Sequence, residues 1–317
     1  MKVSVLVPVY GVAQYIGACA ASLFGQTYRD IEFIFIDDCS PDDSISVLKA
    51  VLKAYPDREN QVRILRHEAN KGVGTARQTA FAHATGEAVM HADSDDILPK
   101  DAVELLVKAM QKGAYDIVTG AYATYENETI GAIMAPPKLS RRRYLRLMLC
   151  QNLVKHHLWA RLYRRAFLQE QHIGFATGID YCEDYTVVTR AFLHAKYGHI
   201  DQVVYYYRTD NVASYTHQIS RKNLVSMLKA NAVVADFFRQ NDRKKTYRMA
   251  LDMGLISMYR EAMKHGMQPK EIELYCPFRP SKLVNRLFLK MMKSGIPLQV
   301  SNVLYLVYRR IARSLGM

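Results

Sequence analysis

Short apolar runs and longer amphipathic stretches take turns along the first 115 residues. An apolar run bounded by polar residues is typical of a buried strand, and an apolar repeat of about 3.6 residues is typical of a helix. The pattern predicts strands at 3–9, 32–36, 62–66 and 87–91, and helices near 12–25, 43–54, 74–85 and 100–112. Regular alternation of this kind predicts an α/β fold with a mostly parallel sheet and helices on both faces.

After residue 115 the pattern changes. The runs DIVTGAYATYE, 130–134 and HIDQVVYYYR predict strands, while a stretch after Pro137 and CEDYTVVTRAFLHA predict helices. From about residue 218 the pattern is helical to the end, with prolines breaking it into segments. We therefore predict an α/β domain over 1–217, composed of halves 1–115 and 116–217, and a C-terminal helical region over 218–317.

The net charge of +13 lies entirely in that helical region. Residues 1–217 carry 24 Lys and Arg against 24 Asp and Glu, whereas residues 218–317 carry 19 against 6, and 19 − 6 = 13. Proteins that bind single-stranded nucleic acid place aromatic side chains among their cations, and the basic stretch has no such interleaving. We therefore expect no nucleic acid partner.

The cysteines and the first residues of the sequence indicate the cellular compartment in which we expect the protein. The chain opens with MKVSVLVPVYG, which predicts a strand and lacks the three-part pattern of a signal peptide. The five cysteines are odd in number and show no disulfide or zinc spacing: Cys19, Cys39, Cys150, Cys182 and Cys276. Both observations favour the reducing cytoplasm.

Residues 282–317 are basic and amphipathic, with seven cations and no acidic residue. The longest apolar stretch there, VLYLVY, is far shorter than the roughly 20 residues of a spanning helix. This composition predicts a segment that lies on an anionic membrane surface, which would be the inner face of the plasma membrane. The alternatives are packing on the α/β domain or a homodimer interface.

Polar residues follow each of the first four predicted strands directly. In an open parallel sheet the carboxyl ends of the strands share one edge, and ligands bind there, where the strand order reverses. Four loops are therefore expected to converge on one crevice. They carry Tyr10, then Asp37 and Asp38, then Asn70 and Lys71, and finally Asp93, Asp95 and Asp96.

The last of these loops, HADSDDIL, concentrates negative charge after an apolar strand. Two carboxylates one residue apart, Asp93 and Asp95, can hold Mg²⁺ or Mn²⁺, which prefer oxygen ligands and share them with substrate phosphates. The alternative is a solvated turn in which Asp96 or Asp101 caps the next helix. His217 is a candidate further metal ligand, or else a packed or exposed histidine.

The third loop, NKGVGTARQTAF, combines glycines and cations before a predicted helix, which suits an anion at the helix N-terminus. A dinucleotide fingerprint would require glycine at position 77, where Arg77 stands, and would follow the first strand. The stretch therefore speaks against a dehydrogenase.

Taken in order, VPVYG, FIDDCSPDDS, NKGVGTARQTAFAHATGEAVMHADSDD, LWARLYRR and the Glu-Asp pair in CEDYT resemble the family 2 glycosyltransferases. The resemblance covers about residues 1–215. It implies the inverting type with the GT-A fold, a nucleotide-diphospho-sugar transferase architecture, found in bacterial polysaccharide synthesis. It also implies a nucleotide-sugar donor, usually UDP-linked, and a divalent metal.

The resemblance assigns the donor site residue by residue. Tyr10 would lie against the uracil, with Pro8 shaping the turn, and Asp37 would accept the uracil N–H. Lys71 and Arg77 would lie beside the base and the diphosphate. On this assignment 1–115 is the nucleotide-binding half and 116–217 the acceptor half.

The same resemblance assigns the metal and the catalytic base. Asp93 would meet the ribose or the donor sugar, Ser94 would line the donor site beside it, and Asp95 would bind the metal. Asp184 would be the base, with Glu183 next to it. A carboxylate at a helix start is otherwise an ordinary residue favoured by the helix dipole.

The implied activity is that of a hexosyl- or N-acetylhexosaminyltransferase acting on a hydroxyl of a growing glycan or lipid-linked glycan. The alternatives are a metal-dependent nucleotidyltransferase, which would not need the Glu-Asp pair, and a non-catalytic nucleotide-sugar-binding relative, which would be expected to lose Asp95 or Asp184. Gly11, Cys39 and Gln78 depart from the common family pattern and are interpreted as packing variants. Trp159, Arg161 and the predicted helix at 140–150 are candidates for the acceptor wall, and Trp159 is equally a candidate for the core.

Overall fold

The computed structural model describes residues 1–150, 154–211, 219–294, 303, 305–307 and 310. The chain forms two compact units that interleave along the sequence. The first comprises Met1–Lys138, His157–Asp180 and His194–Gln218, and the second comprises Leu139–His156, Tyr181–Leu193 and Ile219–Met317. The functional division into 1–217 and 218–317 stays a prediction, because compactness does not say which residues act together.

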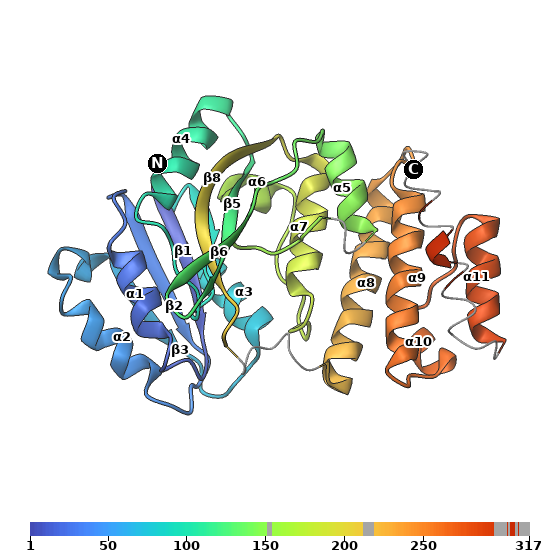
Figure 1. Ribbon diagram of the computed structural model, residues 1–317, viewed down its shortest axis with the longest axis horizontal. Coiled ribbons are helices and arrows are strands. Elements are labelled where there is room, and N and C mark those ends of the chain that lie inside the picture. Colours follow the sequence, from blue (N-terminus) through green and yellow to red (C-terminus); the bar gives the residue numbers. More distant parts are fainter. Residues whose placement is uncertain (151–153, 212–218, 295–302, 304, 308–309, 311–317) are drawn as a thin grey trace. The chain divides into compact units, whose positions relative to one another are not determined.

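The first unit is built on one mixed sheet (Figure 1). The parallel strands and their helices lie where the alternating pattern predicts them. In chain order the elements of this unit are β1 (Val3–Val9), α1 (Ile16–Phe24), β2 (Ile31–Asp37), α2 (Ser44–Leu52), the 3₁₀ helix η1 (Pro56–Gln61), β3 (Val62–Arg66), α3 (Val73–His83), β4 (Ala88–His91), α4 (Ala102–Gly113), β5 (Ile117–Glu126), β6 (Thr129–Met134), β7 (Arg161–Arg164), α6 (Arg165–Glu170) and β8 (Tyr197–Arg208).

The strand order is β3-β2-β1-β4-β7-β5-β6, and β8 pairs with β5. Strands β3, β2, β1 and β4 are mutually parallel, whereas β7 runs antiparallel to both β4 and β5. The chain moves outward from β1 through β2 to β3 and then returns to place β4 on the other side of β1. The strand order therefore reverses between β1 and β4, where this fold class binds ligands.

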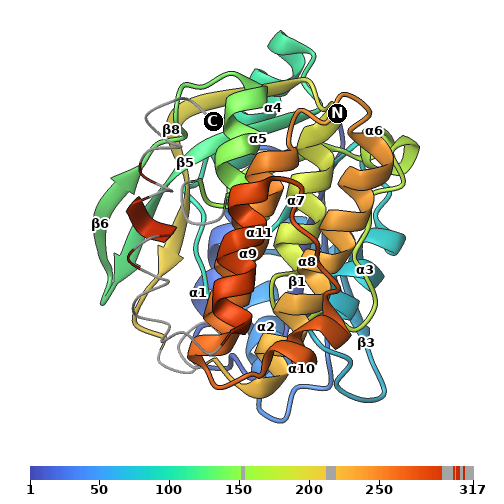
Figure 2. The same cartoon turned by 90° about the vertical axis from the view of Figure 1, so that its right-hand side faces the viewer.

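Both faces of β1, β2 and β4 are buried, whereas the edge strand β3 is only partly buried. Val3, Val5 and Val7 of β1 face a core shared with α1 and α4, and the alternate residue Leu6 is equally buried on the opposite face. Figures 1 and 2 show α1 and α3 on opposite sides of β1. Burial on both faces explains why these strands are apolar runs and not alternating ones.

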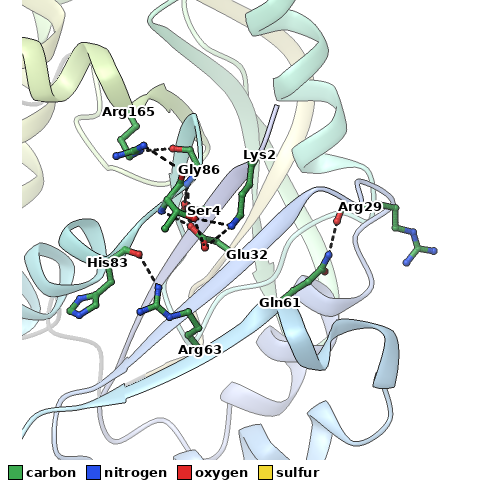
Figure 3. A network of polar contacts seen from close by, with 10 residues as sticks. Lys2, Ser4, Arg29, Glu32, Gln61, Arg63, His83, Gly86 and Arg165 are labelled. Atoms are coloured by element: carbon green, nitrogen blue, oxygen red, sulfur yellow. Dashed lines mark hydrogen bonds and ion pairs between the residues drawn. The ribbon is translucent and has the colours of Figure 1, made fainter.

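A polar network joins the amino ends of three strands, at the edge opposite the loops predicted to bind ligands (Figure 3). Glu32 of β2 accepts hydrogen bonds from Ser4 Oγ at 2.5 Å and from Thr85 N–H at 2.7 Å, and Lys2 Nζ lies 3.0 Å from its other oxygen. Burial raises the pKa of Glu32, but these hydrogen bonds outweigh it and lower that pKa to about 2. The charged carboxylate therefore ties β1, β2 and the start of β4 together.

The second unit is helical, with α9 at its centre. Helix α9 contacts α5, α8, α10 and α11 and buries Leu255, Ile256 and Tyr259 among them. Among the described residues, no helix is long and apolar enough to cross a membrane. The helices of this unit are α5 (Arg141–Leu149), α7 (Glu183–His194, up to Leu193), α8 (Arg221–Asn241), α9 (Arg248–Lys264), α10 (Pro269–Tyr275) and α11 (Leu283–Lys293).

Candidate functional site

Two loops flank the point where the strand order reverses. Tyr10 follows β1 with half of its side chain exposed, and Gly11 takes a left-handed φ of +65°. Glycine adopts that conformation without a steric cost, which is consistent with the interpretation of Gly11 as a packing variant. Asp93 and Asp95 follow β4 on the other side of the reversal.

The loop after β2 is fastened to the loop after β1. Ser44 Oγ accepts the N–H of Val12 at 2.9 Å, and Asp42 accepts the N–H of Ala13 at 2.9 Å. Asp37 is buried and accepts the N–H of Ser40 at 2.8 Å, with Arg66 Nε 3.4 Å from its other oxygen. Each carboxylate oxygen has two lone pairs, so the predicted contact of Asp37 with a base remains chemically available.

Asp38, to which the sequence assigns no role, holds the loop after β3. Its two oxygens accept the N–H of Lys71 at 2.9 Å and the N–H of Gly72 at 2.8 Å. His67 Nδ1 lies 2.6 Å from the first of these oxygens, and His67 Nε2 lies 3.0 Å from Thr79 Oγ1. Asp38 and His67 thus fix the backbone from which the exposed Lys71 side chain extends.

Gly72 also has a steric reason to be glycine. Its φ is +88°, and a Cβ there would overlap the carboxylate of Asp180. In the helix that follows this loop, Gln78 Oε1 accepts the N–H of Phe175 at 2.9 Å. The interpretation of Gln78 as a packing variant is consistent with this contact.

Arg77 of α3 contacts the first aspartate of the pair. Its Nη2 lies 2.5 Å from Asp93 Oδ1, and the Arg77 side chain is almost fully buried. The sequence-based assignment placed Arg77 beside a diphosphate, and the contact found within the protein is with Asp93. The neighbouring Ser94 is buried.

Asp96, the third aspartate, has a structural environment. Tyr205 Oη donates to Asp96 Oδ2 at 2.8 Å, and the Arg208 N–H donates to Oδ1 at 2.7 Å. Burial raises the pKa of Asp96 well above its usual value, and the charges of Asp95 and Asp93 raise it further. Asp96 therefore ties the loop after β4 to the end of β8, while Asp101 occupies the cap position of α4 without a side-chain capping hydrogen bond.

Asp95 has the surroundings expected of a cation ligand. Asn211 Nδ2 donates to Asp95 Oδ2 at 2.7 Å, and no ion pair of Asp95 occurs within the described part of the chain. Burial raises the pKa of Asp95, and the negative charge of Asp93 raises it further. The charge of Arg208, whose Nε donates to the backbone carbonyl of Asp95 at 2.7 Å, offsets this only in part. A divalent cation would supply further positive charge, so the residues present fit one.

The described residues contain no group of three His, Cys, Asp or Glu side chains placed to hold a metal ion by themselves. Mg²⁺ is commonly held by one or two carboxylates together with substrate phosphates, and the Asp95 site is of this kind. The other predicted ligand, His217, lies outside the described residues.

The predicted base lies in the second unit. Glu183 and Asp184 begin α7, where negative charge is favoured by the helix dipole. His156 Nε2 lies 3.6 Å from Asp184 Oδ1, and both side chains are about one quarter exposed. Glu183 is buried, so Asp184 is the more accessible carboxylate of the two.

The assignment of Arg161 to an acceptor wall is wrong. Arg161 is fully buried, and its Nε donates to Thr119 Oγ1 at 3.1 Å. Trp159 is only 8% exposed and stacks on His157 and Tyr205, with ring centroids 3.6 and 4.7 Å away. Of the two interpretations of Trp159, the core one describes its surroundings.

The sequence is similar to a known protein family. The family described as glycosyl transferase family 2 matches residues 4–171, more than half of the 317 residues. The chain belongs to this family. The uncharacterized glycosyltransferase EpsJ of Bacillus subtilis is 29% identical over 215 residues, which are 65% of this chain and 60% of EpsJ.

Solved structures share the fold. S. aureus TarS 1–349 in complex with UDP-GlcNAc matches with a TM-score of 0.64 at 20% identity, over 98% of this chain and 92% of that chain. Mannosyltransferase PcManGT from Pyrobaculum calidifontis, in complex with GDP-Man and Mn²⁺, matches with a TM-score of 0.54 at 20% identity, over 95% and 87%. At such identities the likeness shows the fold alone, and it confirms the predicted GT-A class of this family 2 chain.

Two features of the site were not predicted from the sequence. Asp38 and His67 directly follow β2 and β3, neighbouring parallel strands that end at the same edge, and that placement is the signal that would have paired them. The partners of Asp96, Tyr205 and Arg208, lie more than 100 residues away on β8, and no local pattern connects them to it.

Proposed function

We propose that this chain is a metal-dependent inverting glycosyltransferase that moves a hexosyl or N-acetylhexosaminyl group from a UDP-sugar to a hydroxyl of a growing glycan. The observation that carries the proposal is the environment of Asp95. This partly buried carboxylate has a raised pKa, forms no ion pair among the described residues, and follows β4 at the reversal of strand order. A nucleotide diphosphate with its cation is the ligand class that such a site fits.

The donor would be held by the loops after β1, β2 and β3, which are joined to one another by hydrogen bonds. Tyr10 offers an exposed ring for a base to lie against, with Pro8 and Asp37 beside it at the ends of β1 and β2. Lys71 extends from a backbone fixed by Asp38, and Arg77 holds Asp93, which would meet the ribose or sugar. TarS binding UDP-GlcNAc supports the choice of a uridine diphosphate donor.

In the proposed reaction Asp184 accepts the proton of the acceptor hydroxyl while the hydroxyl oxygen attacks the anomeric carbon. The bond from that carbon to the diphosphate oxygen breaks in the same displacement, so the configuration inverts and UDP leaves. A divalent cation on Asp95, Mn²⁺ or Mg²⁺, would stabilise the negative charge that develops on the leaving diphosphate. PcManGT holds Mn²⁺, which supports a divalent cation here.

The acceptor is proposed to be a glycan or lipid-linked glycan used for cell-surface polysaccharide, assembled in the cytoplasm. The test is a screen of UDP-, dTDP- and GDP-sugars for thermal stabilisation and hydrolysis, with Mn²⁺, with Mg²⁺ and with EDTA. Stabilisation by UDP-sugars that requires the cation is expected. Selective stabilisation by another nucleotide class would overturn the donor assignment, and diphosphate release from a nucleoside triphosphate would favour a nucleotidyltransferase.

A further inference from the structure

Helix α11 in the second unit buries one side and leaves an apolar side open. Asn285, Leu289 and Met292, spaced by four and three residues, form the buried side. On the opposite side Leu283 is 71% exposed and Leu287 is 53% exposed. Residues four apart lie on the same side of a helix, so the two leucines form one stripe.

A stripe of cations runs beside the leucines. Arg286 and Lys290, also four residues apart, are both exposed. Lys282 is exposed immediately before the helix, whereas Lys293 at its far end is paired with Glu273. From residue 274 to the end the sequence has no acidic residue, so the side chains of α11 have no acid of their own segment to pair with.

A second exposed apolar segment is attached next to α11. Tyr305 is buried, donates its hydroxyl to Met253 O of α9 at 2.6 Å, and packs edge-on against Phe288 of α11 with ring centroids 5.5 Å apart. The neighbouring Val303, Leu306 and Val307 are each more than half exposed. Of the nine most exposed large hydrophobic side chains in the described residues, six lie between 274 and 307. The most exposed large hydrophobic side chains of the described residues are therefore concentrated in this C-terminal stretch of the chain.

We propose that this surface, formed by Leu283, Arg286, Leu287, Lys290, Val303, Leu306 and Val307, binds the surface of an anionic lipid bilayer. Exposed leucines beside lysine and arginine fit the boundary between acyl chains and phosphate headgroups, because each kind of side chain meets its own layer. A protein partner would have to supply an apolar surface rimmed with acids, and a second copy of this chain brings cations against cations. Charge complementarity therefore favours the membrane over self-association.

The test is co-flotation of the full chain with vesicles of phosphatidylcholine alone or with phosphatidylglycerol added. Leu283→Ser/Leu287→Ser removes the exposed apolar stripe, and Arg286→Glu/Lys290→Glu reverses the cation stripe. Arg243→Glu/Lys244→Glu makes the same charge change at exposed residues of the loop between α8 and α9. All six positions are exposed, so unchanged melting temperatures are expected.

The wild type is expected to float with the anionic vesicles only, and less so at high salt. Each surface variant should lose about tenfold or more in partition coefficient, and the loop variant less than threefold. No flotation of the wild type, or equal flotation of all variants, overturns the proposal. A dimer in analytical ultracentrifugation that the leucine variant dissociates, without vesicle binding, assigns the surface to self-association instead. None of these readouts needs a sugar donor, so they are independent of the proposed transfer reaction.

Discussion

The guanidinium of Arg77 lies 2.5 Å from the carboxylate of Asp93. This ion pair joins helix α3 to the loop after β4. The two residues come from α3 and from the loop after β4, 16 positions apart in the chain. Arg77 is buried and Asp93 is about one quarter exposed. The ion pair with Arg77 therefore fixes the position of the Asp93 carboxylate.

Arg77→Ala should therefore weaken donor binding. Without its partner, the Asp93 carboxylate is free to turn, and its negative charge is no longer offset near a site that must accept a diphosphate. We expect the Kd for UDP, measured by calorimetry with Mn²⁺ present, to rise about tenfold or more.

The matched control is Arg63→Ala, an exposed arginine of β3 that donates to His83 O at 3.0 Å at the other edge of the sheet (Figure 3). Its Kd for UDP should stay at the wild-type value. An unchanged Kd in Arg77→Ala would show that the Asp93 orientation does not depend on Arg77.

Asp38→Ala should lower the free energy of unfolding more than the same substitution at the nearby Asp43 does. The substitution removes the acceptor of the Lys71 and Gly72 N–H groups and the partner of His67, so the free energy of unfolding should fall by about 2 kcal/mol. Urea denaturation measures this. Asp43→Ala, an exposed residue without a side-chain cap bond, should stay within about 0.5 kcal/mol of the wild type; a loss as large as that of Asp38→Ala would contradict the assignment.

Glu32→Gln gives a pH-dependent loss of stability. The pKa of Glu32 in the folded chain is about 2, below its ordinary value of 4.5, so the folded state favours the charged form. The stabilisation is fully present above pH 4.5 and is lost as the pH falls through about 2. We expect the variant to be less stable than the wild type by on the order of 2 kcal/mol at pH 7, with the difference shrinking steadily below pH 4.5.

Urea titrations between pH 7 and pH 2.5 would follow this difference, with exposed Glu59→Gln as the control. A difference between wild type and Glu32→Gln that stays constant over this range would mean that the hydrogen bonds, and not the charge, carry the stabilisation.

Asp184→Asn should separate binding from catalysis. The proposed base contacts the acceptor and not the nucleotide, so the Kd for UDP should stay within threefold while kcat, followed as UDP release, falls by about 10² to 10⁴. Glu183→Gln is the comparison, because Glu183 is the buried neighbour on the same helix turn. Normal turnover in Asp184→Asn together with a loss in Glu183→Gln would move the base to Glu183.

The parallel half of the fold could be predicted because its signals are local. Strands buried on both faces are uniform apolar runs, and each is followed by an amphipathic helix. The segment 161–170 was not assigned, because β7 has four residues and its pairing with β4 and β5 is a tertiary effect. The association of 139–156 and 181–193 with the C-terminal helices depends likewise on contacts between distant segments, such as the N–H of Tyr181 donating to Ser226 Oγ of α8 at 2.9 Å.

Part of the candidate site could be predicted from the sequence for the same reason. Asp93 and Asp95 stand out because charge follows a buried strand at the edge where ligands bind. Their partners could not be read, since Arg77, Asn211 and Tyr205 reach them only through the folded sheet. The prediction for Arg161 was wrong because an arginine is rarely buried. Here the buried guanidinium donates a hydrogen bond to Thr119.

The measurement that bears most directly on the proposed function is the cation dependence of UDP binding in the wild type and in Asp95→Ala. Calorimetry with Mn²⁺ and with EDTA should show wild-type binding at least about tenfold tighter with the cation, because the cation joins Asp95 to the diphosphate. Asp95→Ala should bind UDP weakly and equally in both conditions. Wild-type-like tight binding in Asp95→Ala, with its dependence on Mn²⁺ unchanged, would contradict the assignment of the cation to this carboxylate.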